Sequence, residues 1–240
     1  MRRFAILLLL LAGISAADVD ESIRLGREAM RARNYDGAIE HFQQATRDDA
    51  THVDAWFRLG LAFAAAEQPQ QALQAYEKTV ELDPTHAKAL NNIANAHFRR
   101  GDYEVALGWY ERALEIEPNY LLAHFHRGWV LRHFARHDEA EDNFRQCMQL
   151  TAANDRERAT QFDCLFYYGA LRFRAGDFEQ AAQVMEQVVS LRESHPEARY
   201  YLGMAYRRLG RMDAAKRQLE IHRQMLRAAR RDDAIEKAKP

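Results

Sequence analysis

The chain has 240 residues, of which 48% are apolar and 29% are charged, and its formal net charge at pH 7 is −1. This composition is typical of a folded globular protein and excludes the disordered and fibrous classes. The near balance of basic and acidic residues argues against a nucleic acid as the main partner.

The sequence opens with the three parts of a secretory signal peptide. Residues 2–3 supply positive charge, residues 4–12 form an apolar run, and residues 15–17 are small, as at a cleavage site. We expect cleavage after Ala17 or, as the other choice, after Ala16; the alternative interpretation is an uncleaved anchor. A membrane-spanning helix needs about 20 apolar residues, so we expect no membrane span in the mature chain. The protein is predicted to be exported, either to the periplasm or out of the cell.

Three series of residues recur along the rest of the chain with one common spacing. They are a small series, an alanine series and a large apolar series: Gly26, Gly60, Ala94, Gly128, Gly169, Gly203; Ala38, Ala72, Ala106, Ala140, Ala181, Ala215; and Phe42, Tyr76, Tyr110, Phe144, Met185, Leu219. Each series advances by 34, 34, 34, 41 and 34 residues. Because three series share the same irregular step, the chain must consist of six repeats.

Each repeat has the pattern of two amphipathic helices joined by a short turn. In the second repeat, Trp56, Leu59, Gly60 and Phe63 have the i, i+3, i+4, i+7 spacing of one helical face. We expect the small residue of the first helix to face the alanine of the second, so that the two backbones pack closely. A single helical pair cannot bury its apolar face alone, so neighbouring repeats must stack.

The turns carry helix start and stop signals. Pro69 suits the first position of a helix. In the third and fifth repeats, Gly101-Asp102 and Gly176-Asp177 combine a glycine for the left-handed end of one helix with an aspartate that caps the next.

This pattern resembles the tetratricopeptide repeat family, whose 34-residue signature contains Trp, Leu-Gly, Tyr, Ala, Phe and Pro. The best matches are in residues 53–86, with Trp56, Leu59, Gly60, Phe63, Ala72, Tyr76 and Pro84, and in residues 87–120, with Leu90, Ile93, Ala94, Ala106, Tyr110, Ala113 and Pro118. The resemblance implies an all-α, right-handed superhelical solenoid of about six helix-turn-helix repeats.

The predicted division of the chain follows from these repeats. It consists of a signal peptide (1–17), a repeat domain (18–229) with repeats near 19–52, 53–86, 87–120, 121–154, 162–195 and 196–229, and a charged C-terminal tail (230–240). Seven extra residues, 155–161, are expected to lengthen the junction between the fourth and fifth repeats. The stretch after Leu219 is expected to form a polar helix that caps the last repeat; the alternative is a basic helix on a membrane surface.

The resemblance also implies that the first helices line a concave groove whose variable positions bind partner peptides. Carried over to this sequence, those positions are Lys88, Asn91, Asn92, Asn95, Phe98, Arg99, Phe125, His126, Trp129, Arg132, His133, Phe166, Tyr167, Phe173, Arg174, Tyr201, Arg207 and Arg208. Arg99, His133, Arg174 and Arg208 have the same place in four successive repeats, so we expect a row of basic residues beside a row of aromatic ones.

Arginine and planar rings suit carboxylates, peptide amides and apolar side chains. The sequence therefore favours protein or peptide partners with acidic residues or a free C-terminus. The alternative is that the arginines only complement helix dipoles near the C-terminal ends of the first helices, an interaction worth about 0.3–1 kcal/mol.

Two narrower specificities are not carried over from the family. The trio Asn91, Asn92 and Asn95 looks like the asparagine rows in the repeats of O-linked N-acetylglucosamine transferases, but it occurs in one repeat only. Lys88 and Asn92 match part of the carboxylate clamp of chaperone-binding repeats, but Ile23 stands where the first repeat would need a lysine.

No pattern of catalytic, cofactor-binding or metal-binding residues is found. The local group His124, His126, His133 and His137 lacks the spacing of a metal site, and groove polarity is the better interpretation. Two interpretations are open for Cys147 and Cys164, which we expect on touching helices. They form a disulfide that is stable outside the cytoplasm, or they are two small core residues.

We therefore predict a non-catalytic scaffold or adaptor of the bacterial cell envelope, which binds extended peptides or helices in its groove and needs no cofactor. One alternative is a structural module that self-associates into a homo-oligomer. The other is a regulatory subunit of an envelope enzyme that is encoded separately.

Overall fold

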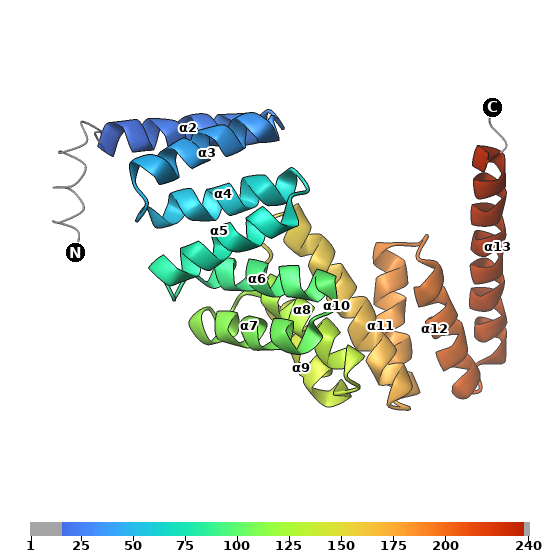
Figure 1. The fold of residues 1–240 in the computed structure, drawn as a ribbon. Coiled ribbons are helices and arrows are strands. Elements are labelled where there is room, and N and C mark those ends of the chain that lie inside the picture. Colours follow the sequence, from blue (N-terminus) through green and yellow to red (C-terminus); the bar gives the residue numbers. More distant parts are fainter. Residues whose placement is uncertain (1–15, 238–240) are drawn as a thin grey trace. The chain divides into compact units, whose positions relative to one another are not determined.

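The computed structural model describes residues 16–237, and every helix in that range is an α-helix (Figure 1). No strand occurs in that part of the chain. The all-helical class predicted from the sequence is therefore confirmed. Most of the predicted signal peptide, residues 1–15, lies outside the described residues. None of the helices within residues 16–237 is long and apolar enough to cross a membrane.

The chain divides into two compact units, Met1–Ala123 and His124–Pro240, which we call the N-terminal and C-terminal units. The described part of the N-terminal unit contains three helical pairs: α2 (Ala16–Arg31) with α3 (Tyr35–Asp48), α4 (Val53–Ala65) with α5 (Pro69–Leu82), and α6 (Ala87–Arg100) with α7 (Tyr103–Ile116). Each helix packs against the next one along the chain, so the pairs are stacked in series (Figure 1).

The C-terminal unit repeats this arrangement. Its pairs are α8 (Leu121–His133) with α9 (His137–Gln149), α10 (Asp155–Arg174) with α11 (Phe178–Leu191), and α12 (Pro196–Arg208) with α13 (Met212–Lys237). The core between the last two pairs is built on Phe162, Met185, Val188 and Leu202 together with four buried alanines. The helix α13 runs through residues 230–237, which we had assigned to a tail.

The seven extra residues correct one expectation. Residues 155–161 do not form a longer junction; they are the first turns of α10, which has 20 residues where the other first helices of the C-terminal unit have 13. Asn154 accepts a hydrogen bond from the backbone N–H of Glu157, and the side chain of Glu157 in turn accepts from the N–H of Ala153. These reciprocal bonds at the N-terminus let the helix begin two turns early.

The turn between the two helices of a repeat always contains one residue in the left-handed conformation. The predicted Gly101 and Gly176 have φ values of +86° and +84°. At the same place in other repeats stand Arg33, Glu67 and Ala135, with φ values of 56–59°. A side chain in this conformation costs about 1–2 kcal/mol, so the turn geometry is imposed by the packing of the pair and not by local preference.

The predicted aspartate caps differ from each other. The Asp177 carboxylate accepts a hydrogen bond from the N–H of Gln180 and caps α11 as expected. Asp102 makes no side-chain bond to its helix, because its carboxylate is turned toward His97 Nδ1 at 3.2 Å and Arg100 Nε at 3.4 Å.

In the five repeats whose small residue is a glycine, the large residue of the second helix covers it. A Cβ atom added to Gly60 would lie 2.5 Å from the ring of Tyr76, and one added to Gly26 would lie 2.5 Å from the ring of Phe42. The contact therefore differs from our expectation: the large series, and not the alanine series, lies over the glycines. The alanines instead let the helices approach, and each of the six is at most 4% exposed.

We predict that Gly60→Ala destabilises the protein by about 1–3 kcal/mol, because the added methyl group overlaps the Tyr76 ring in a packed core. The matched control is Gly108→Ala, since Gly108 is an exposed helical residue with no neighbouring atom within 4 Å of an added Cβ. That control should raise stability by about 0.5–1 kcal/mol. Urea unfolding of the two variants measures the difference, and similar effects in both would contradict the close-approach argument.

Candidate functional site

Aromatic side chains from α8, α10 and α12 form one connected set in the C-terminal unit. Ring centroids are 6.2 Å apart between Phe125 and Tyr167, 6.0 Å between Phe166 and Tyr201, and 5.5 Å between Phe173 and Tyr201. These contacts link the first helices of three successive repeats. We call the set of Phe125, Trp129, Phe166, Tyr167, Phe173 and Tyr201 the aromatic face.

All six side chains of the aromatic face are half-buried. Tyr167 shows the reason, because its ring stacks on the core residue Phe144 with centroids 5.5 Å apart and planes at 23°. Each ring thus uses part of its surface to pack between helices and leaves part open to solvent. Contact with core residues restricts the rotamers of these rings, so little entropy is left to lose on binding.

Arg132 lies against this face. Its guanidinium carbon is 5.0 Å from the ring centroid of Tyr167 and 5.5 Å from that of Trp129, within cation–π range. Its Nε atom is buried and has no hydrogen-bond partner among the described residues. Arg132 is therefore a partly desolvated cation whose planar group is oriented by two rings and is not neutralised by an ion pair with a described residue.

The other predicted arginines of the C-terminal unit, and His133, are exposed. The ring of His133 stacks on Trp129 with planes at 6°, and the guanidinium of Arg208 lies 4.6 Å from the ring of Phe178. Arg174 and Arg207 are exposed, and His126 is half-buried beside Phe125. Arg99 is exposed on α6 of the N-terminal unit, so the row of four basic residues stays a prediction.

The asparagines predicted to line the groove need a correction. Asn91 is only 1% exposed and lies in the core, where a partner cannot reach it. Asn95 accepts a hydrogen bond of 2.6 Å from the hydroxyl of Tyr110, and a polar contact from the Asn92 side chain acts to lower the pKa of Tyr76. Burial raises the pKa of both tyrosines, so their hydroxyls stay protonated and able to donate.

Asn92 and Asn95 thus satisfy the polar ends of two large core residues, and binding an extended peptide is not needed to explain them. The remaining predicted positions on α6 are Lys88, which is exposed, and Phe98, whose ring is 5.5 Å from that of Tyr103.

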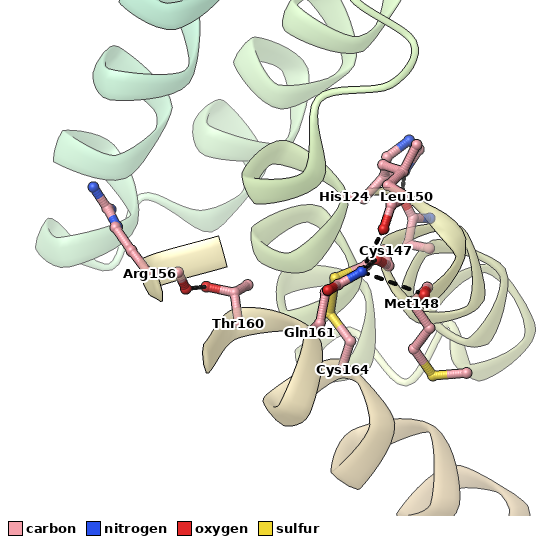
Figure 2. The surroundings of a disulfide bond; sticks show 9 residues. His124, Cys147, Met148, Leu150, Arg156, Thr160, Gln161 and Cys164 are labelled. Carbon is pink, nitrogen blue, oxygen red and sulfur yellow. Dashed lines mark hydrogen bonds between the residues drawn. A yellow bond between two sulfur atoms is a disulfide. The ribbon is translucent and has the colours of Figure 1, made fainter. Parts of the chain in front are cut away.

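Cys147 of α9 and Cys164 of α10 form a disulfide, with Cα atoms 6.4 Å apart and both residues fully buried (Figure 2). The sequence left two interpretations of these cysteines open, and the structure shows the disulfide. The bond joins the end of the fourth repeat to the beginning of the fifth. It therefore holds α10, which carries three residues of the aromatic face, against α9.

Gln161, the last of the seven extra residues, reinforces this junction. Its side-chain amide donates to the backbone carbonyls of Cys147, Met148 and Leu150, at the C-terminal end of α9 (Figure 2). The last carbonyls of a helix have no partner within the helix, so Gln161 supplies one. The extra residues thus cap one helix while they extend the next.

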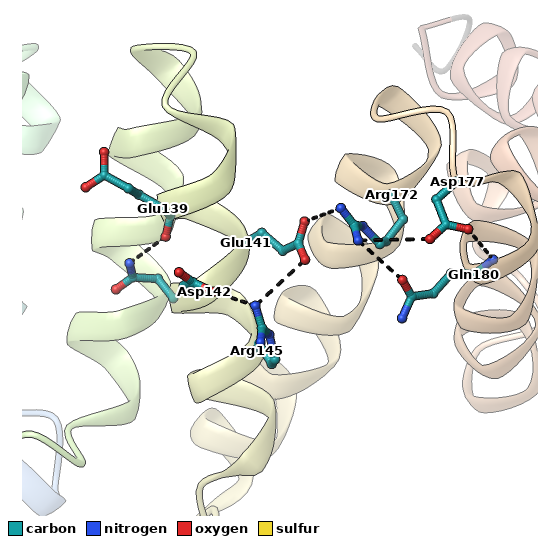
Figure 3. Close-up of polar contacts among 8 residues, drawn as sticks. Glu139, Glu141, Asp142, Arg145, Arg172, Asp177 and Gln180 are labelled. Carbon is teal, nitrogen blue, oxygen red and sulfur yellow. Dashed lines mark hydrogen bonds and ion pairs between the residues drawn. The ribbon is translucent and has the colours of Figure 1, made fainter.

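A half-buried charge network holds the same helices farther along. Arg172 Nη2 of α10 lies 2.7 Å from Glu141 Oε2 of α9, and the two side chains are 23% and 13% exposed (Figure 3). Arg172 also reaches Asp177 and Gln180 at the start of α11. Limited exposure to water strengthens such a pair relative to a surface one, so Arg172 connects α10 with both α9 and the start of α11.

Sequence reasoning missed a set of capping histidines. His52, His86 and His195 each accept a hydrogen bond of 3.2 Å at Nδ1, from the backbone N–H of Ala55, Ala89 and Ala198, respectively. Their spacing follows the repeat, so the signal was present in the sequence. The caps orient α4, α6 and α12, and Phe166 of the aromatic face packs on His195 with centroids 4.7 Å apart.

The predicted histidine group does not form a metal site among residues 16–237, where no three His, Cys, Asp or Glu side chains are close enough to hold an ion. His124 Nδ1 instead lies 3.2 Å from the Asn143 side-chain oxygen.

We predict that replacing both cysteines with alanine lowers the free energy of unfolding by about 3 kcal/mol, the value for a loop of this size. Melting curves with and without reductant measure the effect. Reductant should lower the melting temperature of the wild type and leave that of the double variant unchanged. Mass spectrometry of unreduced protein that found two free thiols would contradict the bond.

The comparisons with known proteins agree with this architecture. One tetratricopeptide repeat model matches residues 23–87 and 169–219, and a second such model matches residues 85–153. The comparison with curated protein sequences gave no match.

Solved structures give the same fold at low sequence identity. The chain is similar to pilF of Pseudomonas aeruginosa, with 18% identity, a TM-score of 0.69 and coverage of 87% of this chain and 92% of that one. It is similar to YrrB, described as a TPR protein with an unusual peptide-binding site, with 20% identity, a TM-score of 0.68 and coverage of 78% and 93%. A repeat protein from Parabacteroides merdae gives 18% identity, a TM-score of 0.63 and coverage of 85% and 78%. Because the family models match most of the sequence and the helical pairs have the geometry described above, we conclude that the chain belongs to the tetratricopeptide repeat family.

Proposed function

We propose that this protein is an exported, non-catalytic interaction scaffold of the bacterial cell envelope. Its aromatic face binds extended segments of partner proteins that carry acidic and apolar side chains. The observation that carries the proposal is Arg132, a half-buried cation without an ion pair to a described residue, held between Trp129 and Tyr167.

Rings and arginine are the residue types that contribute most binding energy at protein interfaces. The rings of the aromatic face are ordered by contacts with each other and with the core. Ordered side chains lose little conformational entropy when a partner binds. This favours recognition of a protein segment whose apolar groups pack on the rings.

Charge decides which segment fits. The planar guanidinium of Arg132 can form two parallel hydrogen bonds with a carboxylate, and Arg174 and Arg208 add exposed positive charge on the neighbouring first helices. The helix dipole alone would attract a cation to the last turn of α8. It gives no reason for the guanidinium to lie over two rings with its Nε atom buried.

Export is supported by two independent features. The first residues have the composition of a signal peptide. The buried Cys147–Cys164 bond fits an oxidising compartment, where disulfides form and persist.

A peptide as the ligand class is also in keeping with the fold. Tetratricopeptide arrays offer extended surfaces that bind other proteins, and the description of YrrB mentions a peptide-binding site in that protein.

The binding proposal can be tested by selecting random decapeptides displayed on phage against the purified mature protein. We expect the enriched peptides to combine Asp or Glu with aromatic or aliphatic residues. Arg132→Ala should weaken binding of synthetic copies by tenfold or more, because a charge-assisted hydrogen bond contributes about 1.5–3 kcal/mol.

Two further variants serve as controls for this selection. Arg132→Lys keeps the charge but not the planar fork, and should recover only part of the affinity. Arg145→Ala removes an exposed arginine of α9 that pairs with Asp142, outside the aromatic face, and should leave affinity unchanged. Enrichment of peptides without acidic residues, or equal loss in the Arg132 and Arg145 variants, would count against the proposal.

Export can be tested by expressing the full chain in a bacterial host and measuring, by mass spectrometry, the molecular mass of the product from the periplasmic fraction. We expect a mass that corresponds to loss of residues 1–17, and retention of the whole chain when residues 2–3 are changed to glutamate. A full-length, cytoplasmic wild-type product would show that the export proposal is wrong.

A further inference from the structure

Positive charge is concentrated at the C-terminal end of the chain. Residues 196–240 contain 12 basic and 6 acidic residues, whereas residues 1–195 contain 22 basic and 29 acidic ones. The formal charge is therefore +6 in the last segment and −7 before it, although the whole chain is close to neutral. An asymmetry of this size favours an anionic partner at one end of the protein.

The charge lies on one side of α13. Six cations in the described part of this helix are exposed. At 3.6 residues per turn they fall within an arc of about 140° around the helix axis. We call this set the basic face; it consists of Lys216, Arg217, Arg223, Arg227, Arg230 and Arg231.

A different side of α13 is used inside the protein, where this last helix packs beside α12 (Figure 1). Leu219 covers Gly203 of α12, and His222 Nδ1 lies 2.8 Å from the backbone carbonyl oxygen of Pro196. Ala215, on the same side, is 3% exposed. The apolar side of the helix is therefore occupied by α12, and the basic face is left in solvent.

The described residues do not neutralise the basic face. Glu220 is the only acidic residue in the sequence between Lys216 and Arg231. It pairs with Arg223, whose Nη2 atom is 2.7 Å from Glu220 Oε2. The other five cations have no ion pair with a described side chain.

Helix stability does not account for this arrangement. Arg223, Arg227 and Arg231 follow each other at intervals of four residues, so like charges are neighbours on the helix surface, which destabilises a helix. The helix dipole favours cations only in the last turn, and α13 continues to Lys237. A surface of mixed charge would keep the end of the stack soluble without this repulsion.

The form of the basic face favours a lipid surface over a protein partner. It extends for about 22 Å along a helix and contains no aromatic residue, whereas protein interfaces concentrate aromatic and apolar side chains at their centre. Met212, 49% exposed, lies within the same arc, and Leu226, 40% exposed, lies at its edge. Guanidinium groups bond phosphate oxygens in pairs, and flanking apolar side chains suit the boundary between headgroups and acyl chains.

We propose that α13 docks this protein on a membrane surface rich in anionic lipids, with the basic face against the headgroup phosphates. The helix lies on the surface and does not cross it, because its apolar side stays packed on α12. This inference goes beyond the scaffold function and concerns a helix that carries no residue of the aromatic face.

The test measures co-sedimentation of the mature protein with lipid vesicles. One set consists of phosphatidylcholine alone, and the other contains about 30% phosphatidylglycerol, an anionic lipid. In about 0.1 M salt we expect binding to the anionic vesicles only. In about 1 M salt the screening length falls from about 10 Å to about 3 Å, so the protein should be released. Equal binding to both sets in low salt, or binding to neither, would overturn the proposal.

Variants locate the docking surface. Changing Arg227, Arg230 and Arg231 together to glutamine should weaken binding to anionic vesicles by about 100-fold, because each cation near a charged membrane adds to the attraction. The control variant has the same net charge but loses three exposed arginines of other helices. Its substitutions are Arg47→Gln, Arg145→Gln and Arg156→Gln, and it should bind like the wild type. Equal losses in both variants would mean that overall charge, and not α13, decides binding.

Three further measurements separate the explanations. Circular dichroism melts of the α13 variant should show a melting temperature no lower than that of the wild type, because like-charged neighbours are removed. Arg132→Ala should bind vesicles normally, so failure of the aromatic face as a peptide site leaves this proposal standing. Binding to immobilised polyglutamate without binding to anionic vesicles would assign the basic face to an acidic protein, and membrane docking would be wrong.

Discussion

The contact on which the structure depends is that between the glycine of a first helix and the large side chain of the second helix, which occurs in five of the six repeats. Gly60 leaves no space for a methyl group beneath the ring of Tyr76, and Gly26 leaves none beneath Phe42. This close contact brings the two helices of a repeat together without a void, as dense packing requires. It also determines which surfaces remain available, because the large residues of the second helices are used inside the stack and the variable residues of the first helices are left at its surface.

This constraint explains why the polar residues of α6 act within the protein. Tyr76 and Tyr110 bring hydroxyl groups into the stack, and a buried hydroxyl needs a partner. Asn92 and Asn95 supply the partners. In the C-terminal unit the corresponding large residue is Phe144, which has no polar group, and its neighbour Tyr167 can use its ring in the aromatic face. The first-helix residues that face these large side chains therefore support the core in the N-terminal unit and form a surface of rings in the C-terminal unit.

The seven extra residues give the C-terminal unit a junction with three kinds of restraint. The disulfide, the Gln161 amide and the Arg172–Glu141 pair all connect α9 with α10. Such restraints lower the freedom of α10, the helix that contributes Phe166, Tyr167 and Phe173. A preformed face binds with a smaller entropic cost than one that must be ordered. The N-terminal unit has a different feature, a pocket between the first two repeats in which Arg58 pairs with Asp54.

The periodicity of the sequence alone determined the helical class, the pairing of helices and where most first helices begin, because helical spacing and the 34-residue step are local properties of the chain. Gly101 and Gly176 were predicted correctly because a left-handed turn is a local preference of glycine. Tertiary structure alone decided that Arg33, Glu67 and Ala135 adopt the same conformation and that Asn91 is buried. The handedness of the predicted superhelix and the row of four basic residues stay predictions. Burial and the orientation of a cation over a ring depend on neighbours far away in the sequence, and no local pattern records them.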